Sequence, residues 1–252
     1  CGCALDLSDP VNDRAMFHLD NAYYFPAAHI RSQRTFTNTV SNTAFRGFGG
    51  PQGMLAGERM IEGVARATGL DPLTVRKRNF YCGPERNITP YFMPVDDFIL
   101  SELVDELEKT SDYWARRDAI REANAANPLI LRGLALTPVK FGISFTATWF
   151  NQAGALIHIY RDGSIHLNHG GTEMGQGLFV KVAQVVSHAF TVPIDQVGVS
   201  ATRTDKVPNT SATAASSGAD LNAMAALNAA NTLKRRLISF AANHFGVDVE
   251  SV

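Results

Sequence analysis

The stretch AGALIHIYRDGSIHLNHG, residues 153–170, decides the fold class. Its two halves, residues 153–160 and 164–170, have the pattern of short strands, and the RDG between them predicts a tight hairpin turn. Together with the preceding segment RGLALTPVKFGISFT, they predict a small antiparallel sheet over residues 129–169. The second half of the chain is therefore expected to begin with β-structure.

Helices are predicted after this sheet. The apolar spacing of FVKVAQVVSHAF, residues 179–190, predicts a helix that starts at glycines, and a last helix is predicted from about Leu221 to Asn243. A short strand near QVGVSAT lies between them in the sequence. Because strands and helices follow one another without steady β–α–β alternation, the chain is predicted to be α+β, with mixed sheets and packed helices.

The first part of the chain has a different pattern. Residues 1–50 contain short alternating segments such as AMFHLD and are predicted to be β-rich. Helices are predicted over residues 53–68, with Gly69 as the C-cap, and over residues 71–78, which begin with an Asp-Pro pair. These two helices directly follow the glycine-rich segment TAFRGFGGPQGM.

A longer helix is predicted from Asp96 to about Asn124, after a loop over residues 82–94. Four apolar residues at helical spacing are expected to form its buried face: Leu100, Leu103, Val104 and Leu107. The pattern changes after Pro128, which predicts one subdomain over residues 1–127 and a second over residues 128–252. Since the chain has no initiator Met and stops directly after a helical pattern, it is expected to be an internal part of a longer protein.

The bulk composition excludes several classes of function. A formal net charge of −1 over 252 residues provides no basic field for nucleic acid, and no apolar run approaches the ~20 residues that cross a bilayer. Three cysteines, Cys1, Cys3 and Cys82, are too few for a disulfide framework, and the Cys1–Gly2–Cys3 pair lacks the further ligands of a closed metal site. We therefore expect a cytoplasmic protein that binds neither nucleic acid nor membrane.

Three loops of small residues could expose their backbone to a ligand: FRGFGGPQ (45–52), GGTEMGQG (170–177) and NTSATAASSG (209–218). Each precedes or adjoins a helix, where unpaired N–H groups favour an anion or an electron-rich group. Any one of them alone is as well explained as a helix cap. None has the spacing of a dinucleotide fingerprint or a phosphate loop, and no hydrolase or zinc-protease motif is present. Together the loops predict a site for a large polar ligand.

These loops, together with KFGISFT (140–146), closely resemble the molybdopterin-binding part of the xanthine dehydrogenase and aldehyde oxidase family. The resemblance extends from about Leu5 to the last helix. It implies that residues 1–127 and 128–252 are the end of one molybdopterin-binding subdomain and the start of a second. It also implies a molybdenum ion held by the pterin's dithiolene, without a direct bond from this protein to the metal.

The resemblance assigns cofactor contacts to seven residues. Gln176 is expected near the apical oxygen of the cofactor, and the main chain at Arg46 and Gly47 near another molybdenum oxygen. Small side chains are expected along the cofactor where bulky ones would collide: Ala214, Ala215, Ser216 and Gly218. Glu173 in the same motif could be nominated as a catalytic carboxylate, but an acid at a helix start is the better explanation.

The substrate contacts implied by the resemblance are four. Phe48 and Phe145 are expected to hold a flat heterocycle between their rings, with Thr146 beside it. Arg14 is the implied catalytic residue, because a fixed guanidinium can meet a substrate oxygen and stabilise negative charge that develops on a purine. From composition alone, core packing explains the two phenylalanines, and a surface position or an ion pair explains Arg14.

The implied reaction is the oxidation of hypoxanthine to xanthine and of xanthine to urate, with water as the oxygen source. The family's catalytic glutamate falls outside this chain, as do the iron–sulfur clusters and the FAD, with NAD as acceptor, so the chain is expected to be inactive alone. Partners are then a purine, an iron–sulfur/FAD subunit or domain, and a second copy, because exposed apolar patches favour association. An aldehyde oxidase, another N-heterocycle hydroxylase or a non-catalytic cofactor-binding module are the alternatives.

Overall fold

The computed structural model describes residues 2, 3, 5–206 and 210–252. The chain divides into two compact units, unit 1 (Cys1–Gly142) and unit 2 (Ile143–Val252), which are described separately here. Cys1 of the Cys1–Gly2–Cys3 pair and residues 207–209, of which Asn209 is the first residue of the third loop, lie outside the described residues. The subdomain boundary predicted after residue 127 was inferred from the change in sequence pattern and differs in kind from this division into units, so it stays a prediction.

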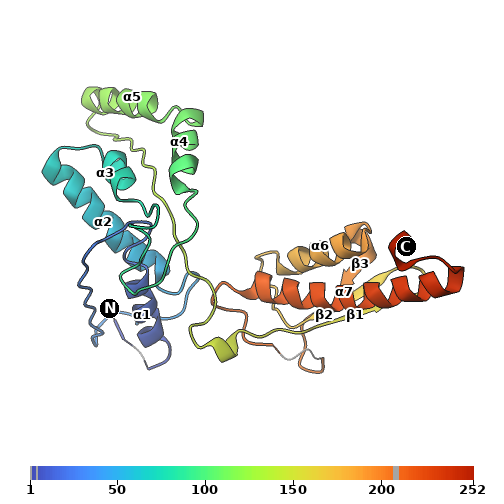
Figure 1. Cartoon of the computed structure of the whole chain (residues 1–252). Coiled ribbons are helices and arrows are strands. Elements are labelled where there is room, and N and C mark those ends of the chain that lie inside the picture. Colours follow the sequence, from blue (N-terminus) through green and yellow to red (C-terminus); the bar gives the residue numbers. More distant parts are fainter. Residues whose placement is uncertain (1, 4, 207–209) are drawn as a thin grey trace. The chain divides into compact units, whose positions relative to one another are not determined.

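Unit 1 is helical. Figure 1 shows its five helices, with bounds α1 Ser8–Phe17, α2 Gly50–Thr68, α3 Pro72–Asn79, α4 Leu100–Thr110 and α5 Tyr113–Ala126. The predictions for α2 and α3 are confirmed together with their caps. Gly69 ends α2 in the left-handed region with φ 69°, and the side chain of Asp71 accepts a hydrogen bond from the Leu73 N–H at 2.9 Å.

The prediction of a β-rich segment over residues 1–50 is wrong. Helix α1 occupies part of it, and the pairing that the structure describes there consists of isolated bridges such as Gly2–Thr35 and Tyr23–Phe80. The alternating segment AMFHLD contains the last turn of α1. Its helical state is favoured by tertiary packing against α2, which overrides a weak local preference.

Three glycines make that packing possible. Gly49, Gly53 and Gly57 recur every fourth residue along one side of α2, and a Cβ built on each would overlap a main-chain carbonyl oxygen of the facing segment. The oxygens belong to Val11, Ala15 and Leu19, respectively. The backbone of α2 therefore lies directly against α1. The sequence suggested that bare backbone in residues 43–54 serves a ligand, and for Gly49 and Gly53 the partner is instead the main chain of α1.

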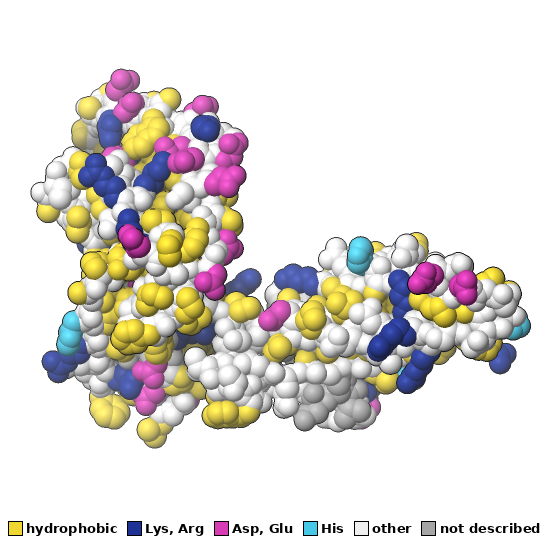
Figure 2. Space-filling model, viewed as in Figure 1, with side chains coloured by type: hydrophobic (Ala, Val, Ile, Leu, Met, Phe, Trp, Pro, Cys, Tyr) yellow, Lys and Arg dark blue, Asp and Glu magenta, His cyan; other side chains and the backbone are white. Residues whose placement is uncertain are grey.

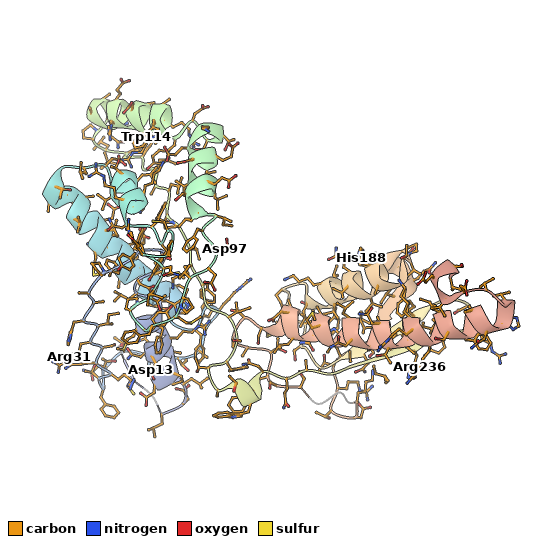
Figure 3. The ribbon with its side chains drawn as sticks, in the orientation of Figure 1. Asp13, Arg31, Asp97, Trp114, His188 and Arg236 are labelled. Carbon is orange, nitrogen blue, oxygen red and sulfur yellow. The ribbon has the colours of Figure 1, made fainter. Side chains whose placement is uncertain are left out.

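The long helix predicted from residue 96 to 124 is two helices. The chain breaks at Asp112, whose φ of 49° lies in the left-handed region, and α4 and α5 flank the break. The Nε1 of Trp114, labelled in Figure 3, donates to Glu108 Oε2 across it at 2.9 Å. Of the predicted buried face only Val104 is fully buried, while Leu103 and Leu107 are 56% and 44% exposed. The predicted buried face is thus wrong at those two residues.

The core of unit 1 encloses an ion-pair network. Arg76 is 2% exposed, and its Nε and Nη2 donate to Glu58 at 2.9 Å and Glu62 at 2.8 Å. The Tyr23 hydroxyl donates to Glu58 at 2.5 Å, so both carboxylates are used by buried donors. Apolar and aromatic side chains surround it, including Ile61, Leu73, Phe80 and Tyr113. A buried guanidinium with two acids keeps its charge, and burial of the Tyr23 hydroxyl raises its pKa.

Unit 2 contains the sheet. Its strands are β1 Ala155–Ile159, β2 Ile165–His169 and β3 Val197–Val199, and its helices are α6 Leu178–Phe190 and α7 Gly218–Phe245, with short 3-10 turns η1 Thr148–Phe150, η2 Ile194–Gln196 and η3 Val249–Ser251 (Figure 1). β1 pairs antiparallel with β2, which confirms the predicted hairpin, and Gly163 takes φ 86° in its turn. β3 is parallel to β2, so the sheet is mixed.

One face of this sheet packs against both helices. Ile157, Ile165, Leu167 and Val197 contact buried residues of α6 and α7, among them Leu178, Val182, Val186, Ala226 and Ala230. The α+β prediction is confirmed. Apolar side chains also lie on the surface of each unit, as Figure 2 shows, and they include Leu107, Trp149 and Phe240. Among the described helices, none is both long and apolar enough to cross a membrane.

The segment RGLALTPVKFGISFT does not form the predicted strand in the part of the chain that the structure describes. Side chains, not a neighbouring strand, satisfy its backbone. The Asn21 amide donates to the Pro138 oxygen at 2.9 Å and accepts from the Lys140 N–H at 3.2 Å, and Gly142 N–H donates to His18 Nε2 at 3.1 Å. Pro138 also has no N–H to donate to a neighbouring strand, which further disfavours strand pairing of this segment.

Candidate functional site

The FRGFGGPQ loop of unit 1 is strained at the predicted site residues. Gly47, Phe48 and Gly49 have successive φ values of 90°, 52° and 96°, and Phe48 has a side chain that disfavours this region by about 1–2 kcal/mol. The Phe48 side chain is half-buried, whereas Arg46 is exposed. Backbone strain in non-glycine residues gathers at ligand sites, so this loop is marked by geometry as well as by sequence.

Arg14 is half-buried near the end of α1, where the side chain of Asp13 is labelled in Figure 3. Its Nη2 donates to the Gly142 carbonyl oxygen, its Cζ lies 5.0 Å from the centroid of the Phe141 ring, and its Nε is buried with no acceptor among the described residues. Burial lowers the pKa of Arg14. Its hydrogen-bond partner is thus a main-chain oxygen and not a carboxylate, so the alternative of an ion pair gains no support from the described residues.

Phe141 connects the two predicted features of unit 1, and sequence reasoning did not single it out. Its ring contacts Arg14 on one side, and its Cε2 would lie 2.6 Å from a Cβ built on Gly50. Arg14 and the FRGFGGPQ loop are thereby brought into one neighbourhood. The signal in the sequence was weak, because Phe141 differs from any core phenylalanine only in its place within the KFGISFT motif.

In unit 2, three loops that are distant in sequence are hydrogen-bonded to one another. Ser144 N–H donates to the Ala215 oxygen at 2.8 Å, and Thr172 N–H donates to Thr213 Oγ1 at 2.8 Å. Ser211 N–H also donates to the Gln152 oxygen at 3.2 Å. The segments ISFT (143–146), GGTEMGQG and SATAASSG therefore lie together in unit 2. This grouping places Phe145, Gln176 and the small-residue loop in the same part of unit 2.

Asn151 fixes the main chain of Phe145. Its Oδ1 accepts from Phe145 N–H at 2.9 Å and its Nδ2 donates to the Phe145 oxygen at 2.8 Å, as a neighbouring strand would. Ser144 has a φ of 73°, so the backbone is strained immediately before the ring. The Phe145 side chain is half-buried against Phe150, with ring centroids 5.7 Å apart, and Thr146 is exposed. Asn151 was not recognised from the sequence.

The small-residue loop is strained at two consecutive positions. Ala215 and Ser216 both have φ 56°, and the side chains of Ala214 and Ser216 are exposed. Gly218 begins α7, and a Cβ there would lie 3.3 Å from Thr213 Cγ2, tighter than most contacts. Non-glycine residues in this region cost about 1–3 kcal/mol each, and the conformation persists only where the surrounding structure imposes it. Small side chains leave this strained backbone open to a flat ligand.

Gln176 is held by its own loop. Its Oε1 accepts from the Met174 N–H at 2.6 Å, and its Nε2 donates to the Thr172 oxygen at 2.9 Å. An amide nitrogen has two hydrogens, so one remains for a ligand. A fixed amide with one spare donor, beside exposed small residues, is the kind of polar contact that can orient the oxygen of a pterin cofactor. The residues present therefore fit that group.

Glu173 caps α6. Its carboxylate accepts main-chain hydrogen bonds from Phe179 at 3.0 Å, Gly177 at 3.0 Å and Gly175 at 2.8 Å. These bonds, the one from Phe179 foremost, lower the pKa of Glu173. The interpretation as a helix-start acid is confirmed, and the positive end of α6 is used by the protein itself.

We expect Glu173→Gln to lower the melting temperature of the chain, because a neutral amide is a weaker acceptor for three N–H groups. A carboxyl with a lowered pKa stabilises the fold above its ordinary pKa of 4.5, and this contribution disappears as pH falls through the folded value. The melting difference measured by circular dichroism at pH 7 should therefore shrink below pH 4.5. Glu85→Gln, at an exposed carboxylate, is the matched control and should leave the melt unchanged. An unchanged melt for Glu173→Gln would contradict the capping role.

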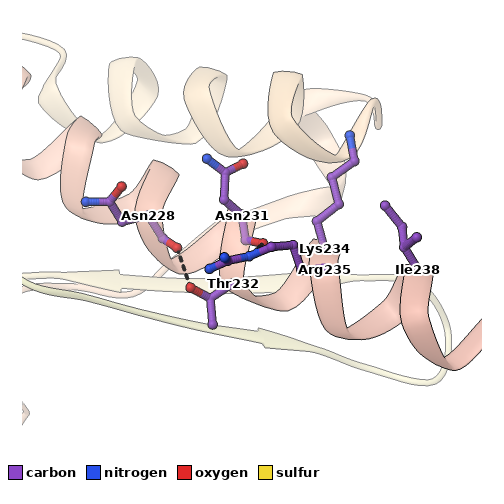
Figure 4. Close-up of a pocket in the computed structure, with 6 residues that line it drawn as sticks. All are labelled: Asn228, Asn231, Thr232, Lys234, Arg235 and Ile238. Carbon is purple, nitrogen blue, oxygen red and sulfur yellow. Dashed lines mark hydrogen bonds between the residues drawn. The ribbon is translucent and has the colours of Figure 1, made fainter. Parts of the chain in front are cut away.

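A groove on α7 lies apart from these loops. Figure 4 shows its lining residues, Asn228, Asn231, Thr232, Lys234, Arg235 and Ile238. All come from one helix, and two of the polar side chains have partners within unit 2: Thr232 Oγ1 donates to the Asn228 oxygen at 2.9 Å and Lys234 Nζ to the Ala189 oxygen at 3.1 Å. It contains none of the predicted site residues, and we place no function there.

The sequence matches two family models and several curated proteins. Residues 1–80 and residues 106–252 each match a family model described as a molybdopterin cofactor-binding domain. The chain is 49% identical over 236 residues to a xanthine dehydrogenase of Calliphora vicina and to a xanthine dehydrogenase/oxidase of Gallus gallus. Each match covers 94% of this chain and 17% of the relative, so the chain spans less than a fifth of the length of these relatives.

The fold also matches a solved structure. Quinoline 2-oxidoreductase from Pseudomonas putida 86 superposes with a TM-score of 0.74 at 22% sequence identity, over 98% of this chain and 31% of that one. At this identity the likeness concerns the fold alone, and it supports the α+β assignment.

Proposed function

This chain belongs to the molybdopterin cofactor-binding domain family, and from that premise we propose that it supplies part of the cofactor and substrate site of a molybdenum hydroxylase that oxidises purines. The observation that carries the proposal is the coincidence of two independent signals. The loops that match the family also contain strained residues, among them Phe48, Ser144, Ala215 and Ser216. The 49% identity to xanthine dehydrogenases supports hypoxanthine and xanthine as the substrates.

The proposed cofactor contacts follow from the loop geometry. Gln176 offers one amide N–H, and the main chain turns through a left-handed conformation at Gly47, directly after the exposed Arg46, where a ligand can approach. The strained small-residue loop would lie along the pterin: Ala214, Ala215, Ser216 and Gly218. When bound, the molybdenum cofactor supplies the oxidising centre and the oxygen that water replenishes.

The proposed substrate contacts hold the substrate ring in place and stabilise its developing negative charge. Phe48 and Phe145 would each present a half-buried ring to a flat heterocycle, and Thr146 an exposed hydroxyl. Arg14 would donate to a substrate oxygen and stabilise negative charge that grows on the ring during oxidation. Its half-burial strengthens that interaction, because water screens it less than at an exposed site.

Other parts of the proposed enzyme lie elsewhere. We propose that iron–sulfur clusters and FAD, with NAD as the final acceptor, belong to other domains or subunits. The three cysteines of this chain are too few to bind such clusters. Exposed apolar side chains such as Phe240 and Trp149 support association with those parts or with a second copy. A homo-oligomer and a cytoplasmic location stay predictions.

A chimeric enzyme tests the function directly. The 236 matching residues of the Gallus gallus xanthine dehydrogenase/oxidase are replaced by those of this chain, and the product, called here the chimera, is assayed with xanthine, hypoxanthine and a small aldehyde. We expect purine oxidation within about tenfold of the parent and an unchanged molybdenum content. A chimera that carries the cofactor but oxidises only the aldehyde would support an aldehyde oxidase, and one that oxidises neither would support a non-catalytic module.

A further inference from the structure

His18 is a buried histidine that the proposed function leaves without a role. It is 5% exposed and lies one helical turn after Arg14, directly beyond the end of α1. Its Nε2 accepts a hydrogen bond from Gly142 N–H at 3.1 Å, and its Nδ1 lies 2.9 Å from the Arg14 carbonyl oxygen. Both ring nitrogens therefore face main-chain groups of fixed polarity.

Those partners determine the protonation state. An amide N–H can only donate, so Nε2 must carry a lone pair, and a carbonyl oxygen can only accept, so Nδ1 must carry the hydrogen. His18 is thus assigned as the neutral Nδ1–H tautomer. Burial lowers the pKa of His18, and the nearby cations Arg14 and Lys140 lower it further, while the hydrogen bond to the Arg14 oxygen and the charge of Asp20 act in the opposite direction. The lowered pKa and the two hydrogen bonds therefore both indicate that the His18 ring is neutral at neutral pH.

His18 and Arg14 are also connected through Gly142 and Phe141. Arg14 Nη2 donates to the carbonyl oxygen of Gly142, whose N–H donates to His18. The Phe141 ring packs against both side chains, with its centroid 4.9 Å from that of His18 and 5.0 Å from the Cζ of Arg14. Gly142 is therefore held at its N–H by an imidazole and at its oxygen by the guanidinium.

We propose that neutral His18 is a positioning residue that fixes Gly142 and thereby orients the Arg14 guanidinium toward the purine. This inference rests on the proposed function of Arg14. Protonation of His18 would place an N–H against the N–H of Gly142 and a second cation beside Arg14. It would remove one of the two hydrogen bonds that hold Gly142, and the guanidinium would lose its fixed partner. A small aldehyde has no second oxygen for Arg14 to meet and should be insensitive to this change.

Variants of the chimera separate the positioning role from a structural one. His18→Leu removes both hydrogen bonds, and we expect kcat/KM for xanthine to fall at least tenfold while aldehyde turnover and molybdenum content stay within twofold. His18→Gln offers an amide oxygen to Gly142 N–H and should recover most of the loss. His29→Gln, at an exposed histidine, is the matched control. In the parent chimera, purine turnover should fall on the acid side of the profile as His18 protonates, and His18→Gln should lack that limb.

The outcomes that would overturn the proposal are distinct from failure of the proposed function. Equal losses with xanthine and aldehyde would show that His18 is merely structural, and no loss in His18→Leu would show that it does not position Arg14. If the parent chimera oxidises no purine, the proposed function fails, and nitrogen NMR of the chain then tests the geometry alone. An Nε2–H or doubly protonated His18 at pH 7.5 would contradict the assignment, whereas an Nδ1–H tautomer would support it.

Discussion

Arg14→Met in the chimera should lower kcat/KM for xanthine about 10²–10³-fold, because one fixed donor aimed at developing charge contributes on that order. Methionine fills a similar volume but provides neither a charge nor a donor. The molybdenum content should stay within twofold of that of the chimera without the substitution, since we propose that Arg14 contacts the substrate and not the cofactor. Steady-state kinetics with xanthine and metal analysis of the same preparation measure both quantities.

Arg14 also bonds the Gly142 oxygen, so its loss has a structural component. A hydrogen bond to a charged group contributes about 1.5–3 kcal/mol, and the melting temperature of the variant should fall accordingly. Arg31→Met, at the exposed arginine labelled in Figure 3, is the matched control and should change neither kinetics nor stability. If Arg14→Met lost cofactor and turnover in equal proportion, Arg14 would be a structural residue.

Gly53→Ala should strongly destabilise unit 1. The new Cβ would overlap the carbonyl oxygen of Ala15, which is main chain and cannot swing away like a side chain. Overpacking of this kind costs about 1–3 kcal/mol and sometimes more, since one helix must move away from the other. Urea unfolding of the chain, followed by helical circular dichroism, measures the free energy of unfolding.

The same helix provides the control. Gly63 lies in α2 with open space around its Cβ position, so Gly63→Ala should stabilise the chain by about 0.5–1 kcal/mol through helix propensity alone. The two variants make the same chemical change in one helix and should shift stability in opposite directions. A neutral Gly53→Ala would mean that α1 and α2 are not in backbone contact.

How far the sequence predicts this fold depends on whether the determining contact is local. The hairpin, α2 with its Gly69 cap and α3 with its Asp71 cap follow from residues within a few positions, and they were predicted correctly. Helix α1 was missed because its helical state depends on glycines about 40 residues later. The segment around Pro138 was mistaken for a strand because its backbone partners are side chains of distant residues.

The candidate site was predicted from motifs, and the structure adds what motifs do not contain. Small-residue composition and the family resemblance marked the loops with Phe48, Gln176 and Ala215 but gave no sign of the strain at Phe48 and Ala215. Asn151 and His18 were missed, because a side chain that bonds main-chain groups leaves no periodic or compositional pattern. Their importance is visible only once the donors and acceptors around them are known.

Asn21 has a consequence for the tolerance of this protein to insertions. The single Asn21 amide bonds both the Pro138 oxygen and the Lys140 N–H, so it fixes the spacing between these two main-chain groups. An extra residue between those positions would break one of the two bonds and shift Phe141 and Gly142 by a full step. Length variation is therefore expected to accumulate in turns such as the one at Gly83, where nothing crowds the backbone, and to spare this short span.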